Sequence, residues 1–408
     1  MTSEQTILAI CIPTFERARY LDCLLTHLAE ILSEFPYSYE VIISDNASTD
    51  NTQEIVEKWS KDLPIRYFKQ ATNIGMFRNP RFVLEKSNSQ FSLCVADDDL
   101  LEPEGLKSAI ESLLNEPDAV ILYAPWILYD LVNKTTLRNF FDIPNDIVIN
   151  HGNFAHLLSL ILQHHIFAEI PIIRTEAYKK LMPSENKLAF FAFTVPAEYL
   201  ALGKVLFQKA PFYKSVTAYF ADEGRVQAGH AGAEEAWDSY EGGLEHLLGL
   251  SMPALTDENI SLLREKIREF VTMRMLVALR LRVNTGRDPI ESYYLASRLR
   301  GLGAMEHLPR PFEIIRAQAA LWFVTHDENL VEGVQTVILV GGFEKSVADF
   351  LETICDLKIR LSDKFPRDTD HSILILKGGA VAYEYDLEDE RARHNRIILE
   401  PELMNKFL

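Results

Sequence analysis

Residues 91–99 read Phe91-Ser92-Leu93-Cys94-Val95-Ala96-Asp97-Asp98-Asp99, a mostly apolar run that ends in three consecutive carboxylates. A second acidic segment, Ser44-Asp45-Asn46-Ala47-Ser48-Thr49-Asp50, lies about fifty residues earlier. A buried strand that ends in carboxylates places hard oxygen ligands at the carboxyl edge of a sheet. A divalent cation held there can be shared with substrate phosphates, so the two segments predict a metal site beside a nucleotide diphosphate.

The first hundred residues alternate between strand and helix patterns. Short apolar runs are separated by segments in which apolar residues recur at helical spacing. We expect strands at 7–12, 39–44, 65–68 and 91–96, and helices at 20–32, 49–59 and 79–87. Strands separated by such helices need crossover connections and therefore predict a doubly wound, mainly parallel α/β sheet.

The length of the chain predicts more than one domain, because 408 residues exceed the usual size of one. We expect an α/β domain at 1–240, a mostly helical region at 241–332 and a small α/β unit at 333–408. Residues 259–282 form a basic amphipathic helical pattern. Such a helix can lie on an anionic membrane, but packing against the first domain is the simpler interpretation.

The composition excludes several classes of protein. A formal net charge of −18 provides no broad positive surface for nucleic acid. No apolar stretch reaches the roughly 18 residues that a membrane span requires, and the N-terminus lacks the basic start of a signal peptide. The four cysteines are widely separated. We therefore expect reduced thiols and a cytoplasmic protein, whose membrane contact, where it exists, is peripheral and at the inner face.

Four motifs in the first 105 residues resemble, in order and spacing, those of the family 2 glycosyltransferases with the GT-A fold. They are Ile12-Pro13-Thr14-Phe15-Glu16-Arg17, the segment 44–50, Asn73-Ile74-Gly75 with Arg78-Asn79, and Ala96-Asp97-Asp98-Asp99-Leu100 with Pro103. The resemblance is nearest to enzymes that build bacterial O-antigen and capsule sugars, and it covers about residues 5–225. It implies an enzyme that moves a hexose from a UDP- or dTDP-sugar to a glycan or a lipid-linked saccharide.

The resemblance also implies the donor site. The residues that it places around the nucleotide sugar are Pro13, Thr14, Phe15, Glu16, Arg17, Asp45, Asn73, Gly75, Arg78, Asn79, Asp97 and Asp98. Asp45 would accept the imide proton of uracil or thymine, and Arg78 would face the diphosphate. Mn²⁺ or Mg²⁺ would bind at Asp97, Asp98 and Asp99, with His230 as a late ligand. The family usually has Asn at the position of Glu16.

Family members invert the anomeric centre, so a general base must take a proton from the acceptor hydroxyl. By position, Glu198 is the first candidate for this base, and Asp222 and Glu223 are the reserves. A simpler interpretation exists for each carboxylate, because acidic residues also favour turns and helix starts. Glu198, for instance, can simply cap a helix that begins after Pro196.

Two other functions remain open. A sugar-nucleotide pyrophosphorylase shares the general fold class, but it should begin with a glycine-rich loop and a basic residue for the triphosphate, which residues 13–17 do not provide. A transferase-like subunit that binds or scaffolds without turnover is the other alternative. The intact acidic triplet argues against that second alternative.

Overall fold

The computed structural model describes residues 5–181, 187–222, 233–366, 369–378 and 396–408. The chain divides into two compact units, which are treated separately below. The N-terminal unit comprises residues 1–231 and 236–271, and the C-terminal unit comprises residues 232–235 and 272–408. The three-part division expected from the sequence stays a prediction.

An eight-stranded sheet forms the centre of the N-terminal unit, in the order β3-β2-β1-β4-β10-β6-β11-β9. Its strands are β1 (Leu8–Thr14), β2 (Tyr39–Asp45), β3 (Ile65–Lys69), β4 (Phe91–Cys94), β6 (Ala119–Tyr123), β9 (Ile147–Ile149), β10 (Pro171–Arg174) and β11 (Lys204–Phe207). β10 runs antiparallel to β4 and β6, and β9 runs antiparallel to β11. The other pairings are parallel. This confirms the predicted doubly wound, mainly parallel sheet.

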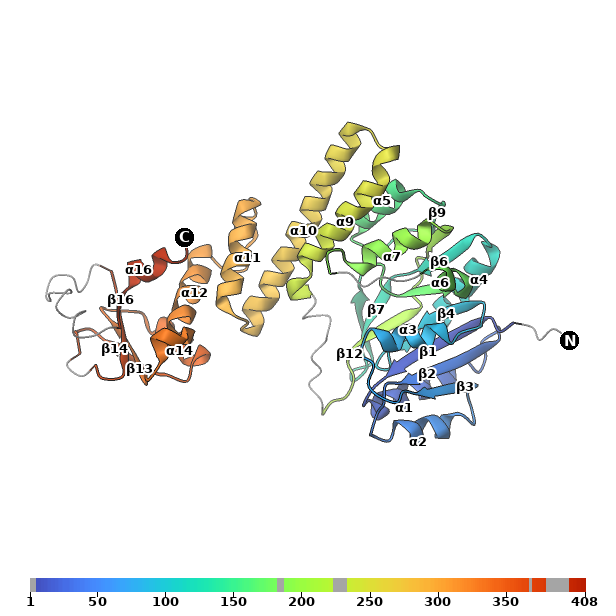
Figure 1. Ribbon diagram of the computed structural model, residues 1–408, viewed down its shortest axis with the longest axis horizontal. Helices are drawn as coiled ribbons and strands as arrows, with labels where there is room; N and C mark the ends of the chain where they lie inside the picture. Colours follow the sequence, from blue (N-terminus) through green and yellow to red (C-terminus); the bar gives the residue numbers. More distant parts are fainter. Residues whose placement is uncertain (1–4, 182–186, 223–232, 367–368, 379–395) are drawn as a thin grey trace. The chain divides into compact units, whose positions relative to one another are not determined.

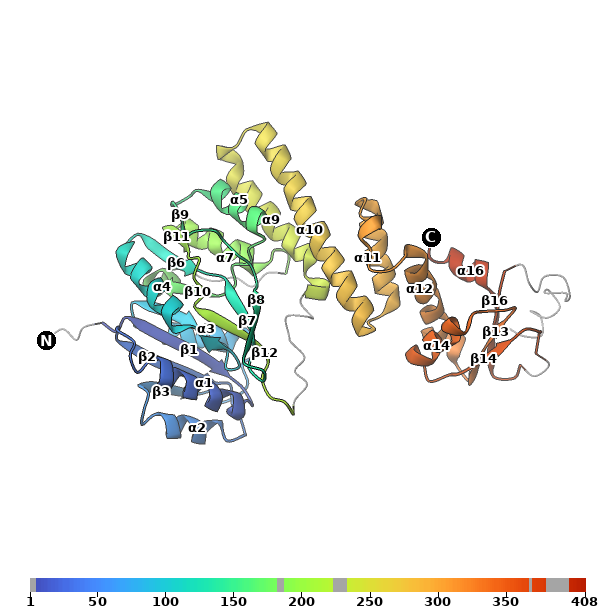
Figure 2. The same cartoon turned by 180° about the vertical axis from the view of Figure 1, so that it is seen from behind.

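Helices cover both faces of this sheet, with α3 toward the viewer in Figure 1 and α1 toward the viewer in Figure 2. The helices of the unit are α1 (Ala18–Ile31), α2 (Thr52–Trp59), α3 (Arg78–Glu85), α4 (Pro103–Asn115), α5 (Phe154–His164), α6 (Thr175–Lys180), α7 (Phe191–Leu200), α9 (Trp237–Ser251) and the 3-10 turn η1 (Met252–Ala254). Alternate residues of β1 and β2 face opposite sides of the sheet, which explains why helices pack against both faces. Ala9, Cys11 and Ile42 pack with Val83 of α3, and their neighbours along each strand face the other way.

A second, smaller sheet has the order β5-β12-β7-β8. Its strands are β5 (Leu100–Leu101), β12 (Tyr213–Ala218), β7 (Trp126–Asp130) and β8 (Thr135–Asn139). β5 follows the acidic triplet directly and pairs with the start of β12. The second sheet therefore brings residues 213–218 next to residues 97–99.

The long helix α10 (Asp257–Thr285) contains the predicted basic amphipathic pattern. In the part that belongs to the N-terminal unit, Ile260, Leu263, Ile267 and Phe270 are buried. The Phe270 ring stacks against His165 and lies edge-on to Phe193. The apolar face of this part of α10 is thus packed against the protein, as the simpler interpretation expects. Membrane contact stays a prediction. Among the described residues, no helix combines the length and the apolar character needed to cross a membrane.

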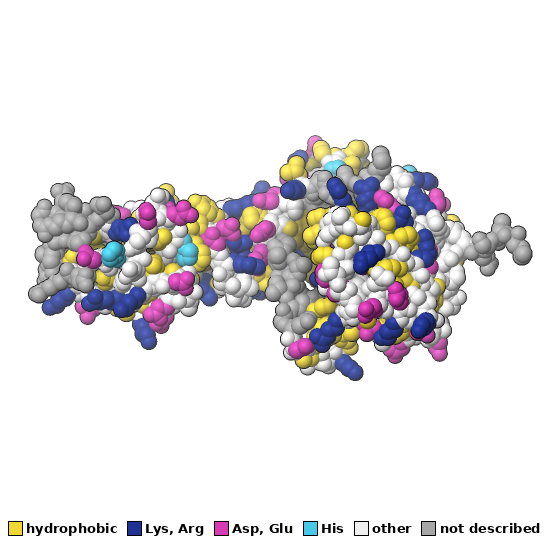
Figure 3. All heavy atoms as spheres, turned by 60° about the horizontal axis from the view of Figure 1, so that its bottom comes forward, with side chains coloured by type: hydrophobic (Ala, Val, Ile, Leu, Met, Phe, Trp, Pro, Cys, Tyr) yellow, Lys and Arg dark blue, Asp and Glu magenta, His cyan; other side chains and the backbone are white. Residues whose placement is uncertain are grey.

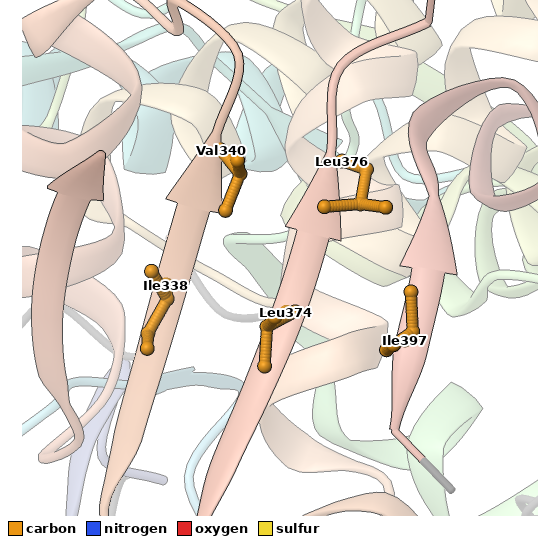
Figure 4. Packing of buried hydrophobic residues seen from close by; sticks show 5 residues of the cluster. All are labelled: Ile338, Val340, Leu374, Leu376 and Ile397. Atoms are coloured by element: carbon orange, nitrogen blue, oxygen red, sulfur yellow. The ribbon is translucent and has the colours of Figure 1, made fainter. Parts of the chain in front are cut away.

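The C-terminal unit contains a four-stranded parallel sheet in the order β14-β13-β15-β16. Its elements are α11 (Pro289–Gly301), η2 (Met305–His307), α12 (Phe312–His326), α13 (Glu328–Val331), β13 (Thr336–Val340), α14 (Lys345–Ile354), β14 (Lys358–Ser362), β15 (Ser372–Leu376), β16 (Ile397–Leu399) and α16 (Glu400–Asn405). One face of the sheet carries the buried cluster of Ile338, Val340, Leu374, Leu376 and Ile397 (Figure 4). The unit thus contains a small α/β sheet, and a separate domain at 333–408 stays a prediction.

Basic and acidic side chains are interspersed on the face drawn in Figure 3. No extended blue surface gathers there. The formal net charge of the chain is −18, and the expected absence of nucleic-acid binding stays a prediction.

Gly105 provides a test of the packing next to the acidic triplet. It lies buried in the first turn of α4, where an added Cβ would stand 1.8 Å from the carbonyl oxygen of Pro211. Because backbone must shift to accept that atom, we expect Gly105→Ala to lower the free energy of unfolding by about 2–4 kcal/mol in urea titrations.

Gly249 is the matched control, because it lies exposed in α9 with no atom within 4 Å of an added Cβ. Gly249→Ala should stabilise the protein by about 0.5–1 kcal/mol through helix propensity. Equal effects of the two substitutions would contradict the close approach of α4 to Pro211.

Candidate active site

Three of the quoted segments meet at one edge of the central sheet. β1, β2 and β4 are parallel neighbours and end at Thr14, Asp45 and Cys94. Parallel strands share their carboxyl edge. Residues 14–17, 45–50 and 97–99 therefore lie close together at that edge. The sequence predicted this convergence from the order of strands and helices.

Asp97 and Asp98 form a buried pair that shares a single cation. Their side chains are 6% and 7% exposed. One nitrogen of Arg17, Nη1, lies 3.1 Å from Asp97 Oδ1 and 2.7 Å from Asp98 Oδ2. Thr14 Oγ1 donates a hydrogen bond of 2.7 Å to Asp97 Oδ2. The pair is therefore fixed by the first loop of the chain.

Burial raises the pKa of Asp97 to about 6, and the charge of Asp98 adds to this rise. The Thr14 hydroxyl and the Arg17 guanidinium act in the opposite direction. Two adjacent carboxylates away from water repel each other, and the half-exposed guanidinium of Arg17 opposes this repulsion. A buried carboxylate pair of this kind favours the approach of cations.

Asp99 has a different environment from its two neighbours. Its Oδ1 accepts a hydrogen bond of 2.8 Å from the Val216 amide, and its Oδ2 accepts one of 2.9 Å from the Tyr213 hydroxyl. Both oxygens are thus used to hold β12 against the end of β4. Asp99 therefore helps to attach the second sheet, and its role as a metal ligand stays a prediction.

The Asp97–Asp98 pair suits a Mg²⁺ or Mn²⁺ ion that is shared with substrate phosphates, rather than an ion held by protein ligands alone. No group of three or more His, Cys, Asp or Glu side chains in the described ranges is arranged to hold a metal ion. Mg²⁺ is commonly held by one or two carboxylates together with substrate phosphates and water. Two hard carboxylate oxygens at the sheet edge fit that pattern. His230, the predicted late ligand, lies outside the described residues.

Asp45 is fully buried at the end of β2. Its Oδ1 accepts a hydrogen bond of 2.8 Å from the Ser48 amide, and its Oδ2 accepts one of 2.6 Å from the Tyr67 hydroxyl. Burial and the hydrogen bond to Asp45 raise the pKa of Tyr67. These contacts shape the turn after β2, and the direct bond from Asp45 to a nucleotide base stays a prediction.

Glu16 joins the first loop to the second acidic segment. Its Oε1 accepts hydrogen bonds of 2.8 and 2.9 Å from the amide and hydroxyl of Thr49, and its own amide donates to Ser48 Oγ. Its φ is +53°, in the left-handed region that Asn tolerates better than Glu. This conformation explains why Asn is suitable at that position in the family, and the two bonds to Thr49 offset the strain of Glu.

The segment 73–79 is held by amide side chains. Asn46 Nδ2 donates to Asn73 Oδ1 over 2.9 Å, and Asn73 Oδ1 also accepts from the Gly75 amide over 2.8 Å. Gly75 has a φ of +93°, which favours glycine. Asn79 is buried and exchanges hydrogen bonds with Ser44. The structure therefore uses Asn73, Gly75 and Asn79 to shape the loop.

Fewer side chains of the predicted donor site are exposed than the motifs suggest. Phe15 is 41% exposed, and Pro13 is half-buried beside it. Arg78 is exposed at the first position of α3. Together with Arg17, these residues can reach a donor from the carboxyl edge.

Glu198 lies near the C-terminal end of α7, and its role as the base stays a prediction. The short turn 201–203 connects α7 to β11, which runs parallel to β6, and the Lys204 amide donates to Asp118 at the start of β6. The C-terminal end of α7 is therefore at the amino edge of the sheet, away from the edge that carries Asp97. Burial raises the pKa of Glu198, and neighbouring His246 lowers it.

The sequence interpretation of α7 was wrong about its start. A helix beginning after Pro196 would place Glu198 in the first turn, but α7 begins at Phe191 and contains Pro196. Pro196 is the sixth residue of the helix. It therefore lies beyond the first turn, and the first turn is the part of a helix in which a missing backbone donor costs least. The apolar residues before Pro196 are buried and extend the helix toward its N-terminus.

Asp222, the reserve candidate, lies nearer the carboxyl edge. Arg19 Nη1 and Nη2 donate to its two oxygens over 3.2 and 3.3 Å, and this arginine also lies over the Phe220 ring at 3.5 Å. Phe220 and Tyr219 pack against Tyr20, one turn into α1. The hydrogen bond from Arg19 lowers the pKa of Asp222. Glu223 lies outside the described residues.

Tyr213 and Tyr67 were missed by sequence reasoning. Each tyrosine hydroxyl binds a carboxylate at the site, at Asp99 and Asp45 respectively. Tyr67 stands in a recognisable strand two residues before its end, but the carboxylate partner comes from the neighbouring strand. The Tyr213 contact crosses 114 residues, so local pattern carried no signal for it.

Substitutions at Asp99 test its structural role. Asp99→Ala leaves the Val216 amide and the Tyr213 hydroxyl without their buried acceptor, so we expect the free energy of unfolding to fall by about 2–4 kcal/mol. Tyr213→Phe keeps the Val216 bond to Asp99 but removes the bond from the Tyr213 hydroxyl and the acceptor of the Ala96 amide, so it should cost about 1–2 kcal/mol. A large loss of Mn²⁺ affinity in Asp99→Ala with unchanged stability would contradict this assignment.

The raised pKa of Asp97 predicts a pH dependence of stability with a defined sign. The folded protein binds this proton more tightly than the unfolded chain does, whose carboxyl has a pKa of about 3.9. The contribution of Asp97 to stability therefore falls as pH rises from about 4 to about 6. In urea titrations without divalent cation, the stability of Asp97→Asn relative to wild type should rise by about 1–3 kcal/mol across that range.

Asp222→Asn is the control for this pH experiment, because the pKa of Asp222 is lowered by Arg19 in an exposed pair. Its contribution is present at neutral pH and is lost as pH falls, which is the opposite sign. Since exposed ion pairs contribute little, the control curve should stay close to wild type. A flat difference between Asp97→Asn and wild type would contradict the buried, raised-pKa state of Asp97.

The comparisons with known proteins agree with the geometry of this edge. The model of the family described as glycosyl transferase family 2 matches residues 9–175. A segment of 102 residues is 33% identical to abequosyltransferase RfbV of Salmonella typhimurium, and it covers 24% of this chain and 30% of that protein. A segment of 103 residues is 36% identical to poly(ribitol-phosphate) beta-N-acetylglucosaminyltransferase TarS of Staphylococcus aureus, and it covers 25% of this chain and 18% of TarS.

Among solved structures, the crystal structure of S. aureus TarS residues 1–349 in complex with UDP-GlcNAc aligns with a TM-score of 0.47 and 19% identity. The alignment covers 78% of this chain and 85% of that one. In sequence, the chain spans less than a third of the length of the two curated relatives described above. The matched residues include the three segments that meet at the carboxyl edge, and this part of the chain, residues 9–175, is therefore similar to the family 2 glycosyltransferases, as its motifs implied.

Proposed function

We propose that the chain transfers a hexose from a UDP- or dTDP-sugar to a hydroxyl group of a bacterial surface glycan or its precursor. The reaction inverts the anomeric centre and depends on Mg²⁺ or Mn²⁺. The observation that carries the proposal is the buried Asp97–Asp98 pair at the carboxyl edge of the sheet, within the residues that match the family 2 model. The printed names of RfbV and TarS, which describe an abequosyltransferase and an N-acetylglucosaminyltransferase, support sugar transfer.

Negative charge develops on the leaving diphosphate of the donor and has to be compensated. When the acceptor oxygen bonds to the anomeric carbon, the bond to the diphosphate breaks and its electrons stay with the leaving phosphate oxygen. A divalent cation on Asp97 and Asp98 supplies Lewis-acid stabilisation of that oxygen. Arg17 and Arg78 are the basic side chains at this edge that can approach the diphosphate from solvent.

The acceptor end needs a base that takes the hydroxyl proton during attack. Asp222 follows the aromatic cluster of Tyr20, Tyr219 and Phe220, which begins next to Arg17. Glu198 lies toward the amino edge. We therefore place the base at Asp222 rather than at the first candidate from the sequence, with Arg19 holding its carboxylate at the edge of the site.

Donor binding tests the proposed function directly. We would measure thermal shifts of the full chain with UDP-, dTDP-, GDP- and CMP-sugars, each with Mn²⁺, Mg²⁺ or EDTA. Stabilisation by a uridine or thymidine sugar only with metal is expected, and 100 times the Kd gives about 2.7 kcal/mol. Asp97→Asn and Asp98→Asn should lose the metal-dependent part of the shift.

Two matched variants separate binding from turnover. Asp222→Asn should keep the donor-induced shift and lose release of the nucleoside diphosphate, because it removes only the base. Glu198→Gln should keep both. Donor binding without turnover in the unmodified chain, with a range of saccharide acceptors, would support the scaffold alternative, and a metal-independent shift would remove Asp97 and Asp98 from a metal role.

A further inference from the structure

We propose that a cavity beside the second sheet binds an uncharged saccharide chain, which is the part of the acceptor glycan that lies beyond the reacting hydroxyl group. The inference deepens the proposed function and rests on it for the identity of this glycan as the acceptor. The cavity has a volume of about 440 Å³. Two segments line it, residues 139–146 between β8 and β9 and residues 209–211 between β11 and β12.

The cavity lies on the same side of the central sheet as the acidic triplet. β11 runs parallel to β6 and ends at Phe207, two residues before Lys209. Ile147, the first residue of β9, pairs with Phe207, so Asp146 also lies at this edge. β6 is in turn parallel to β4, because both run antiparallel to β10. The cavity and residues 97–99 are therefore both at the carboxyl edge of one sheet.

The second sheet connects the cavity to the acidic triplet. β5 follows Asp99, and β12, β7 and β8 lie side by side in Figure 2. At one end of this sheet Leu101 pairs with Tyr213, and Ile127 pairs with Asn139, which lines the cavity. Neighbouring strands are roughly 4.8 Å apart, so three spacings separate β5 from β8 by about 14 Å. A chain of a few sugar residues along this end of the sheet spans that distance.

Each carboxylate of the cavity keeps one oxygen for a ligand. Asp142 Oδ1 accepts a hydrogen bond of 2.8 Å from the Asn139 side chain, and Asp146 Oδ1 accepts one of 2.7 Å from the Lys209 amide. Among the described residues, Oδ2 of either aspartate and Nζ of Lys209 have no hydrogen-bond or ion-pair partner. The internal bonds thus orient two carboxylates whose second oxygens are available as acceptors, next to an ammonium donor.

The wall formed by residues 209–211 is fixed before a ligand binds. Gln208 is buried, and its Nε2 donates hydrogen bonds of 2.6 Å to the Ala210 carbonyl and 3.1 Å to the Gly105 carbonyl. The carbonyl of Pro211 lies directly against Gly105. Because this wall is held by α4, little conformational entropy is lost when a ligand contacts it.

A saccharide matches the chemistry of this lining. Ile143 is buried and Pro211 is half-buried, so both offer apolar surface to the C–H groups of a sugar ring. The free carboxylate oxygens accept hydrogen bonds from hydroxyl groups, and the lysine donates to them. Two carboxylates and one ammonium leave one net negative charge, which disfavours phosphorylated and uronate sugars, whereas the ammonium disfavours a bare metal ion. An uncharged saccharide is therefore the ligand that this cavity suits.

Binding of defined oligosaccharides by the full chain tests the site. We would titrate the protein, without donor or metal, with neutral oligosaccharides of glucose, galactose, mannose, rhamnose or N-acetylglucosamine, from monosaccharides to hexasaccharides, by calorimetry. At least one series should bind, and more tightly as its chain lengthens. Asp142→Asn and Asp146→Asn keep an oxygen for the internal bond but replace the free oxygen with an amino group, so each should bind about tenfold more weakly.

Two further variants separate the cavity from a general effect. Ala210 is exposed, so Ala210→Trp should fill the cavity without lowering Tm and should abolish oligosaccharide binding. Asp62→Asn, an exposed substitution outside the cavity, should bind like wild type. Where turnover is measured, Ala210→Trp should raise KM for long acceptors and leave KM for the donor unchanged, a split that a merely structural role would not give.

Three results would overturn the proposal. They are equal oligosaccharide affinity in wild type and Ala210→Trp, binding of polygalacturonate fragments but not of neutral oligosaccharides, and no saccharide binding by wild type at millimolar concentration.

These outcomes are separable from failure of the proposed function. If a neutral oligosaccharide binds wild type but not Ala210→Trp, and no nucleotide sugar binds either protein, the proposed reaction fails and the cavity stands as a saccharide site. If a uridine sugar binds with metal and is turned over, but the cavity variants bind and use acceptors like wild type, the reaction stands and the role of the cavity fails.

Discussion

Two adjacent carboxylates held away from water are the constraint on which the rest of the site depends. Asp97 and Asp98 are each less than a tenth exposed, and their repulsion is not screened as it would be in solvent. A buried charge is tolerated only when it is paired and hydrogen-bonded. Thr14 at the end of β1 and Arg17 in the loop after it contribute to that requirement, so this loop and residues 97–99 have to be placed together.

The other contacts at this edge make that placement rigid. Glu16 bonds to Thr49, the Ala18 amide bonds to Asp50, and Asn46 bonds to Asn73. Each bond joins two different loops, so the three loops that follow β1, β2 and β3 form one connected network. Asp99 extends it to the second sheet through β12. A site prepared in this way needs little reorganisation when charge develops on a substrate.

Much of this arrangement was predictable from sequence, because strands and helices of the first hundred residues follow clear periodicities and the parallel sheet then brings its carboxyl ends together. The sequence could not predict the different contacts of the three neighbouring aspartates, Asp97, Asp98 and Asp99. Asp99 differs from Asp97 only through Tyr213 and Val216, which lie more than a hundred residues away. The start of α7 was misplaced because Pro196 suggests a helix start, whereas buried apolar residues before it extend α7 to Phe191.

The strain at the pair links stability to function. Because burial and the charge of Asp98 raise the pKa of Asp97, the ionised site costs the folded protein free energy that Arg17 offsets only in part. A tighter permanent counter-ion would stabilise the fold, but it would also close the position at which a divalent cation has to bind. Among the described residues, the half-exposed Arg17 compensates part of the charge of this pair. A divalent cation held by the two carboxylates would compensate more of it, so the arrangement that costs the fold free energy is also the one that suits cation binding.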